Sequence, residues 1–250
     1  MMKKLIFLLF IAFPLLHAQD PSARFEEANR LFKSGNYREA IGAYRQLVAE
    51  GYRGHELYFN LGLAYSRTGE TGYSILFLEK SLLHDRNNAK AHSLLINENL
   101  KIKEKIVPVP EFFIFKFFRD IAGLASVWSW LLIVFILFLL LLAAVTGYIL
   151  KFHGLTHGRA LVVTGLLLLL IALTLPPFLI RYDNARNLRE CVVLDSSIHL
   201  YEIPEREGKK AGLITEGNKL RVTGSVAGWY RVTLPNGKEG WILMKGVGEV

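Results

Sequence analysis

The chain has little cysteine: Cys191 is the only one in 250 residues. A single thiol excludes an internal disulfide and any metal site built from several cysteines. It leaves open an intermolecular bridge through Cys191. The fold must therefore hold together without internal disulfides.

The short motifs of common enzymes are also missing. The sequence has no Gly-rich phosphate-binding loop, no HExxH zinc motif and no GxSxG nucleophile turn. His153 and His157 have the spacing of metal ligands, but glycines adjoin them and no third ligand is evident. We therefore expect a protein that is not an enzyme and that carries no cofactor or metal.

The soluble-looking parts have little net charge, although the formal net charge of the whole chain is +8. Residues 19–107 carry 13 Lys/Arg and 11 Asp/Glu, and residues 190–250 carry eight of each. The other nine Lys/Arg and three Asp/Glu flank apolar segments, where basic side chains meet lipid headgroups. Nucleic-acid binding would need a basic stripe on a folded domain, so we do not expect it.

What the chain does have is apolar runs. Residues 1–18 begin Met-Met-Lys-Lys, continue through an apolar stretch and end in His17-Ala18, which is typical of a signal peptide. An uncleaved anchor is the alternative. Residues 127–150 and 160–181 hold uncharged runs of 24 and 21 residues, each long enough for a transmembrane helix. Pro176-Pro177 should kink or end the second.

The link between these runs, residues 151–159, is short enough to make them a hairpin. Both flanking domains then lie on one side of the membrane. A signal peptide places that side outside the cytoplasm, in the periplasm of a bacterium, and makes 151–159 a cytoplasmic loop at the inner membrane. The flank charges alone mildly favour the opposite orientation.

Residues 108–126 are rich in phenylalanine, with Lys116, Arg119 and Asp120 keeping one strip polar. This composition favours a segment lying in the membrane interface ahead of the first span. A helix packed beneath the preceding domain is the alternative.

Residues 19–107 show a helical period and an internal repeat of 34 residues. Tyr58-x-x-Leu61-Gly62-x-x-Tyr65 and Ala40-x-x-x-Tyr44 resemble the two helices of the tetratricopeptide repeat, although Arg86 replaces the usual closing proline. The resemblance implies an all-α repeat domain. Lys90 to about Lys105 would be the first helix of a third unit, or a cap.

Such repeats usually bind peptides in a groove. The resemblance places this peptide-binding groove at Phe25, Asn29, Phe59, Asn60, Leu63 and Lys90. A clamp for a C-terminal carboxylate would use Phe25, Asn29, Asn60, Lys90 and Leu94, but the outer two positions lack the family's cations. A groove for another partner segment, or a spacer held by its own packing, are the alternatives.

Short strand-like runs separated by glycines fill residues 190–250, with Asn236-Gly237 as a hairpin signal. Gly228-Trp229-Tyr230 and Gly240-Trp241-Ile242 resemble the bacterial SH3-like domain, which implies a small all-β barrel. Members bind cell-wall peptides or protein segments. The ligand-binding face would comprise Tyr201, Trp229, Tyr230 and Trp241, unless the tryptophans mainly fill the core.

The fold class is thus a multi-domain membrane protein, and the module order resembles the repeat-bearing proteins of the Bacteroides aerotolerance group. That resemblance implies a membrane-anchored scaffold or adaptor in envelope stress or aerotolerance. Its partners would be membrane-anchored proteins with von Willebrand A-type domains and a MoxR-type ATPase. The alternative is a protein that binds or senses peptidoglycan through the SH3-like domain.

Overall fold

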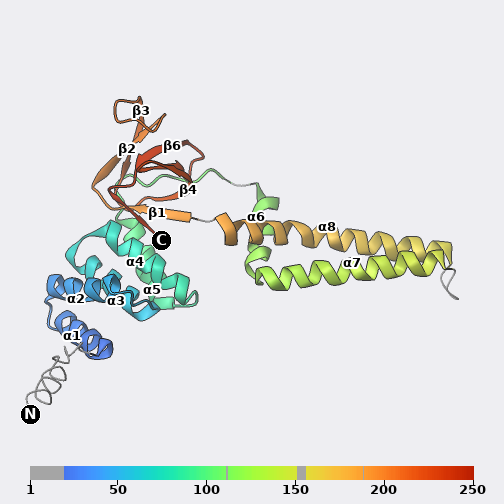
Figure 1. Ribbon diagram of the computed structural model, residues 1–250, viewed down its shortest axis with the longest axis horizontal. Helices are drawn as coiled ribbons and strands as arrows, with labels where there is room; N and C mark the ends of the chain where they lie inside the picture. The colour runs from blue at the N-terminus through green and yellow to red at the C-terminus, as the bar shows by residue number, and fades with distance from the viewer. Residues whose placement is uncertain (1–19, 111, 151–155, 188) are drawn as a thin grey trace, which may run out of the picture.

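The computed structural model describes residues 20–110, 112–150, 156–187 and 189–250. The predicted signal peptide and most of the predicted loop 151–159 lie outside these residues. A head of helices and strands carries a long helical hairpin that projects to one side (Figure 1).

Five helices form the N-terminal part of the head, and their starts repeat every 34 residues, as Pro21, His55 and Ala89 illustrate. The small residues Ala28 and Ala40 are fully buried and let paired helices approach closely. A side chain on Gly62 would stand 3.0 Å from Leu78. The helices are α1 (Pro21–Lys33), α2 (Tyr37–Ala49), α3 (His55–Thr68), α4 (Thr71–His84) and α5 (Ala89–Leu100).

Glycine ends the first helix of each pair. Gly35 and Gly69 have φ angles of 85° and 83°, in the left-handed region that L side chains avoid. The chain can therefore reverse within a few residues and pack α2 on α1 and α4 on α3. The third unit stops after α5, which ends at Leu100, short of the expected Lys105.

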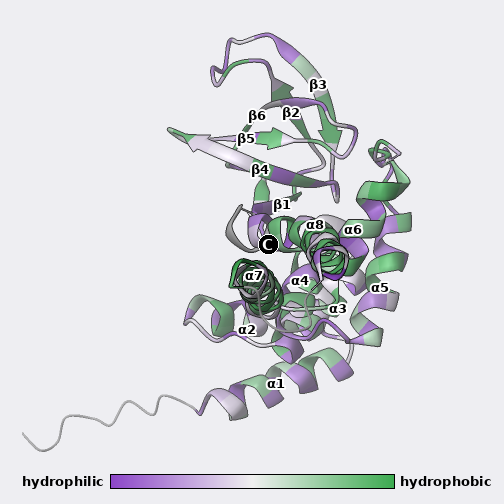
Figure 2. Ribbon diagram, turned by 90° about the vertical axis from the view of Figure 1, so that its right-hand side faces the viewer, coloured by the Kyte–Doolittle hydropathy of each residue, from purple (hydrophilic) through white to green (hydrophobic). Residues whose placement is uncertain are grey.

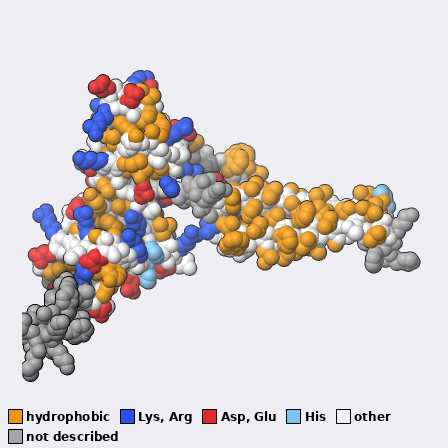
Figure 3. Space-filling view, viewed as in Figure 1, with side chains coloured by type: hydrophobic (Ala, Val, Ile, Leu, Met, Phe, Trp, Pro, Cys, Tyr) orange, Lys and Arg blue, Asp and Glu red, His pale blue; other side chains and the backbone are white. Residues whose placement is uncertain are grey.

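The hairpin consists of α7 (Val127–Ile149) and α8 (His157–Asn187), preceded by the short helix α6 (Phe113–Gly123). Both helices are long and apolar enough to cross a membrane, by length and composition. Figure 2 shows them end-on as hydrophobic cylinders, and hydrophobic side chains cover the hairpin in Figure 3. Pro176 and Pro177 do not end α8, which continues to Asn187.

The C-terminal part is one antiparallel sheet of seven strands, in the order β3-β2-β6-β5-β4-β1-β7. Leu200, Ile214, Leu220, Val232 and Ile242 are buried in its core. The last strand, β7, was not expected from the sequence. The strands are β1 (Arg189–Val193), β2 (Ser197–Tyr201), β3 (Lys210–Thr215), β4 (Lys219–Val226), β5 (Trp229–Thr233), β6 (Glu239–Leu243) and β7 (Val247–Glu249).

Besides the core of the sheet, the helical and β parts contribute to one hydrophobic cluster, called the shared core below, although α7 and α8 separate the two parts in the sequence. Val192 of β1 is fully buried in the cluster that contains Leu61 and Ile75 of the helices. Ile102, just after α5, belongs to the same cluster. A side chain on Gly217 would lie 2.9 Å from Ile102. The head is thus a single packed unit rather than two independently tethered modules.

Candidate peptide-binding surfaces

One cavity of about 380 Å³ brings together most of the residues predicted for the repeat groove. Phe25, Asn29, Phe59, Asn60 and Lys90 line it. They come from α1, α3 and α5, the first helices of the three units, because the 34-residue period places equivalent positions side by side.

The remaining two expected residues lie elsewhere. Leu63 is half-buried and is not among the residues that line this cavity. Leu94 packs with Leu78 and Leu82 in a small hydrophobic cluster between α4 and α5. Leu94 therefore contributes to packing of the last helix.

Two asparagine side chains that line this cavity, Asn29 and Asn60, are hydrogen-bonded to each other. Asn29 Oδ1 accepts hydrogen bonds from Tyr44 Oη at 2.7 Å and from Asn60 Nδ2 at 3.0 Å. Burial raises the pKa of Tyr44 to about 12, so this phenol remains a donor at neutral pH. Asn60 lines the cavity, and its side-chain amide has the donor and acceptor chemistry that a ligand backbone requires.

Carboxylates share the cavity. Glu26 and Glu56 line it together with His55, and Lys90 is its cation. Asn29 Nδ2 already donates to Glu26 at 3.3 Å. Two acids against one lysine do not favour a free C-terminal carboxylate, so the groove chemistry suits an internal peptide segment better than a carboxylate clamp.

The four aromatic residues expected on the SH3-like face do not all reach the surface. Trp229 is only 7% exposed and Tyr201 only 8%, and their rings meet edge to face at 5.2 Å. Both fill the β core rather than a ligand groove. Trp241 and Tyr230 are half-buried, on neighbouring strands of the sheet.

Tyr230 is tied to the end of the chain. Its hydroxyl donates to Glu249 on β7, and this bond raises the pKa of Tyr230 to about 12. The acceptor Glu249 belongs to β7, the strand that was not predicted from the sequence. Trp241 pairs across the sheet with Tyr201.

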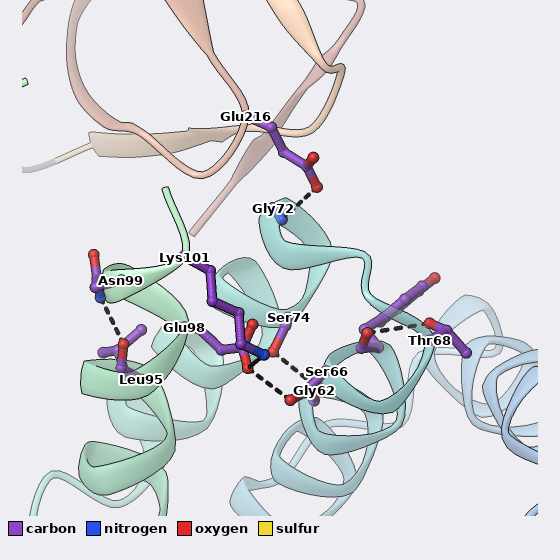
Figure 4. A network of polar contacts seen from close by, with 11 residues as sticks. Gly62, Ser66, Thr68, Gly72, Ser74, Leu95, Glu98, Asn99, Lys101 and Glu216 are labelled. Atoms are coloured by element: carbon purple, nitrogen blue, oxygen red, sulfur yellow. Dashed lines mark hydrogen bonds and ion pairs between the residues drawn. The ribbon is translucent and has the colours of Figure 1, made fainter. Parts of the chain in front are cut away.

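The contacts between α4 and the β part were not foreseen from the sequence. Glu216 accepts a hydrogen bond of 2.7 Å from the Gly72 N–H at the start of α4 (Figure 4). Lys219 lies 3.1 Å from Glu79 and 3.2 Å from Glu190. Burial lowers the pKa of Lys219, but the attraction of the two carboxylates outweighs it and the net direction is upward.

Asn218, also unforeseen, is a polar residue only 3% exposed, and it binds the segment that follows α5. Its Oδ1 accepts from the Ile106 N–H at 3.0 Å, and its Nδ2 donates to the Glu104 carbonyl at 3.0 Å. Residues 108–110, expected to belong to the interfacial segment, line a cavity against the β part instead. The local sequence does not predict the hydrogen bonds of Asn218, because their partners Ile106 and Glu104 lie 112 and 114 residues away in the sequence.

Comparison with known proteins shows which family the β part resembles. The family model for the bacterial SH3 domain matches residues 196–247. Among solved structures, the C-terminal SH3 domain of myosin IB from Entamoeba histolytica is 25% identical, over 26% of this chain and 95% of that one, with a TM-score of 0.19. No curated protein matches the chain. Residues 196–247, which cover strands β2 to β6, are a bacterial SH3 domain.

Proposed function

We propose that this protein is a non-catalytic scaffold anchored in the bacterial inner membrane, with its head on the extracytoplasmic side. The helices α1 to α5 act as tetratricopeptide-like repeats that recruit a partner segment. The helices α7 and α8 span the membrane. The SH3 domain completes the head.

The observation that carries this proposal is the shared core of the head. Val192 and Ile102 are buried in one cluster with the helices, yet α7 and α8 lie between them in the sequence. Such packing needs both parts on the same side of a bilayer. Two spans in a hairpin meet that requirement, whereas one span would not.

Topology has a direct test. Protease added to spheroplasts should degrade the head, because the proposal places it outside the cytoplasm. Protection of the head in intact spheroplasts, with cleavage only after lysis, would overturn the orientation while leaving the scaffold proposal standing.

The recruiting surface is the cavity around Asn29, Phe59 and Asn60. The resemblance to the Bacteroides aerotolerance group suggests membrane proteins with von Willebrand A-type domains, working with a MoxR-type ATPase, as the recruited partners. A role in envelope stress would follow from that assembly.

Site-specific photo-crosslinking tests recruitment. A photoreactive residue at Phe59 should form an adduct with a defined membrane protein in native membranes, and Asn60→Ala should reduce the adduct severalfold by removing backbone contacts. The same group at Arg45, exposed on α2, is the matched control. Equal adducts from both positions, or none from Phe59, would count against recruitment through the groove.

Peptidoglycan binding is the second candidate, and the bacterial SH3 match supports it. The half-buried Trp241 would stack on the ligand. Sedimentation of the detergent-solubilised chain with insoluble peptidoglycan measures this, with Trp241→Ala as the variant. Sedimentation that depends on Trp241, without a Phe59 adduct, would favour wall binding over scaffolding.

A further inference from the structure

The segment that leaves α5 crosses the β part in an extended conformation before it reaches α6. We define residues 104–109 as the strap; most of its side chains are exposed, including Val107 at 75% and Val109 at 55%. Ile106 is the exception, because it is half-buried against the core of the β part.

The β part holds the strap through backbone groups. Asn218 offers both ends of its side-chain amide, accepting from the Ile106 N–H and donating to the Glu104 carbonyl, each at 3.0 Å. The Thr215 hydroxyl donates to the same carbonyl at 3.3 Å. Farther along, the Val109 N–H donates to the Pro235 carbonyl at 3.2 Å.

An asparagine amide that pairs with the C=O of one residue and the N–H of the residue two places on imitates a neighbouring β-strand. Such pairing recognises an extended peptide backbone and is compatible with many different side chains. Selectivity then comes from the apolar contact at Ile106. Asn218 is held in position for this role, because its Nδ2 also donates to the Thr215 carbonyl at 3.1 Å.

Space remains beside the strap. A cavity of about 620 Å³ is lined by Pro108, Val109 and Pro110 on one side and by Leu220, Leu234 and Pro235 of the β part on the other. The buried rings of Tyr201 and Trp229 are not among its lining residues, so this face is separate from the predicted aromatic face.

We propose that the face around Asn218 and Pro235 is a binding site for an extended, proline-containing peptide, and that the strap of the same chain occupies it in cis. A partner segment of the same chemistry can bind there only by displacing the strap. Since the strap leads directly into α6, displacement would also loosen the connection between head and membrane.

The test uses the full chain in detergent and a fluorescent peptide with the sequence of residues 102–110. In one chain, residues 104–109 are replaced by glycine and serine to vacate the site. The peptide should bind this strap-free chain and not the unmodified chain. Binding to both chains alike, or to neither, overturns the proposal.

A second peptide carries N-methyl isoleucine at the position of Ile106. It lacks the N–H that Asn218 accepts and should bind the strap-free chain about tenfold more weakly or worse. Equal binding of the two peptides would contradict backbone recognition by Asn218.

Amide hydrogen exchange in the otherwise unmodified chain checks the cis occupancy even if the strap-free chain folds poorly. The Ile106 amide should exchange slowly, and Asn218→Ala should accelerate it. Thr223→Ala, which alters the same cavity wall without a strap hydrogen bond, is the control and should leave the rate unchanged. Fast exchange at Ile106 in the unmodified chain would overturn the proposal.

Discussion

Cys191 shows how burial decides the chemistry of a single residue. Its side chain is fully buried in the β core, and burial raises the pKa of the thiol to about 12, with Glu249 and Glu190 adding to the effect. A thiol in this state is neither a nucleophile nor available for an intermolecular bridge.

We therefore predict that iodoacetamide will not modify Cys191 in the folded chain at pH 8.5, and that denaturant will expose it. An unfolded thiol has a pKa near 8.5, so the raised folded value contributes stability that is fully present below about pH 8.5. That contribution falls as the pH rises toward about 12. Mass spectrometry measures the modification, and rapid labelling without denaturant would contradict the burial of Cys191.

Glu98 is a second residue whose role only its contacts reveal. It is fully buried in α5, where its Oε1 accepts from Ser66 Oγ of α3 and from Lys101 Nζ, each at 2.6 Å (Figure 4). Its Oε2 has no hydrogen-bond partner among the described residues. The carboxylate thus joins the last helix to the helix of the preceding unit at the cost of one unpaired oxygen.

Glu98→Ala should lower the free energy of unfolding by about 1–3 kcal/mol, because it leaves the half-buried Ser66 hydroxyl without its acceptor. Chemical denaturation followed by circular dichroism measures the change. Glu27→Ala, which removes an exposed i,i+3 ion pair, should cost under about 1 kcal/mol and serves as the control. A loss no larger than that of the control would argue against a structural role for Glu98.

At the scale of single elements, the start of α4 packs tightly against β1. A Cβ on Gly72 would stand 2.5 Å from the Val193 carbonyl oxygen, a backbone atom that cannot move aside cheaply. Glycine is required at position 72 because any side chain would clash with the backbone of β1, and not because of its φ angle.

Gly72→Ala should destabilise the docking of α4 on β1 by about 1–3 kcal/mol. The matched control is Gly42→Ala in α2, where nothing lies within 4 Å of the added methyl. The control should be neutral or stabilising by up to about 1 kcal/mol, because alanine favours helix. Thermal unfolding compares the two, and equal effects would show that α4 and β1 are not tightly docked.

The helix α6 presents an apolar surface that the rest of the chain does not cover. Phe113 is 73% exposed and Phe115 63%, and the same helix carries the basic residues Lys116 and Arg119. The indole of Trp130 in α7 donates to the Ala122 carbonyl at 3.3 Å and fixes α6 at the base of the hairpin. An exposed aromatic face beside two helices that are apolar enough to span a membrane is consistent with a position at the lipid interface.

A nitroxide label at Phe115→Cys, in a Cys191→Ala background and in lipid vesicles, should collide more often with oxygen than with a water-soluble nickel complex. The label at Lys103→Cys, exposed before the strap, should show the reverse order. Preferential collision of the Phe115→Cys label with the nickel complex would contradict placement of α6 in the lipid interface.

At the scale of the whole molecule, the shared core makes the head one cooperative unit. We predict that the helical and β parts unfold in a single transition, seen alike by helical circular dichroism and by the fluorescence of Trp229 and Trp241. Ile102→Ala should shift both signals together and cost about 2–5 kcal/mol, because Ile102 is buried at the junction. Two separate transitions would show independent domains.

Features that depend on local periodicity and composition could be predicted from the sequence. The predicted 34-residue period agrees with the spacing of the helix starts, the uncharged runs predicted the long apolar helices α7 and α8, and the Gly-Trp pairs pointed to the SH3 domain. The expected groove positions Asn29 and Asn60 meet because that period places them on neighbouring helices.

The contacts between these parts could not be predicted in this way and became evident from the folded chain. The Gly72–Glu216 bond spans 144 residues and the Ile106–Asn218 bond 112, so no local pattern encodes either partner. The same holds for Tyr201 and Trp229: their alternation on strands is compatible with a surface or a core, and packing placed them in the core. Burial and long-range pairing depend on which surfaces exclude water together, and that is a property of the folded chain rather than of any segment.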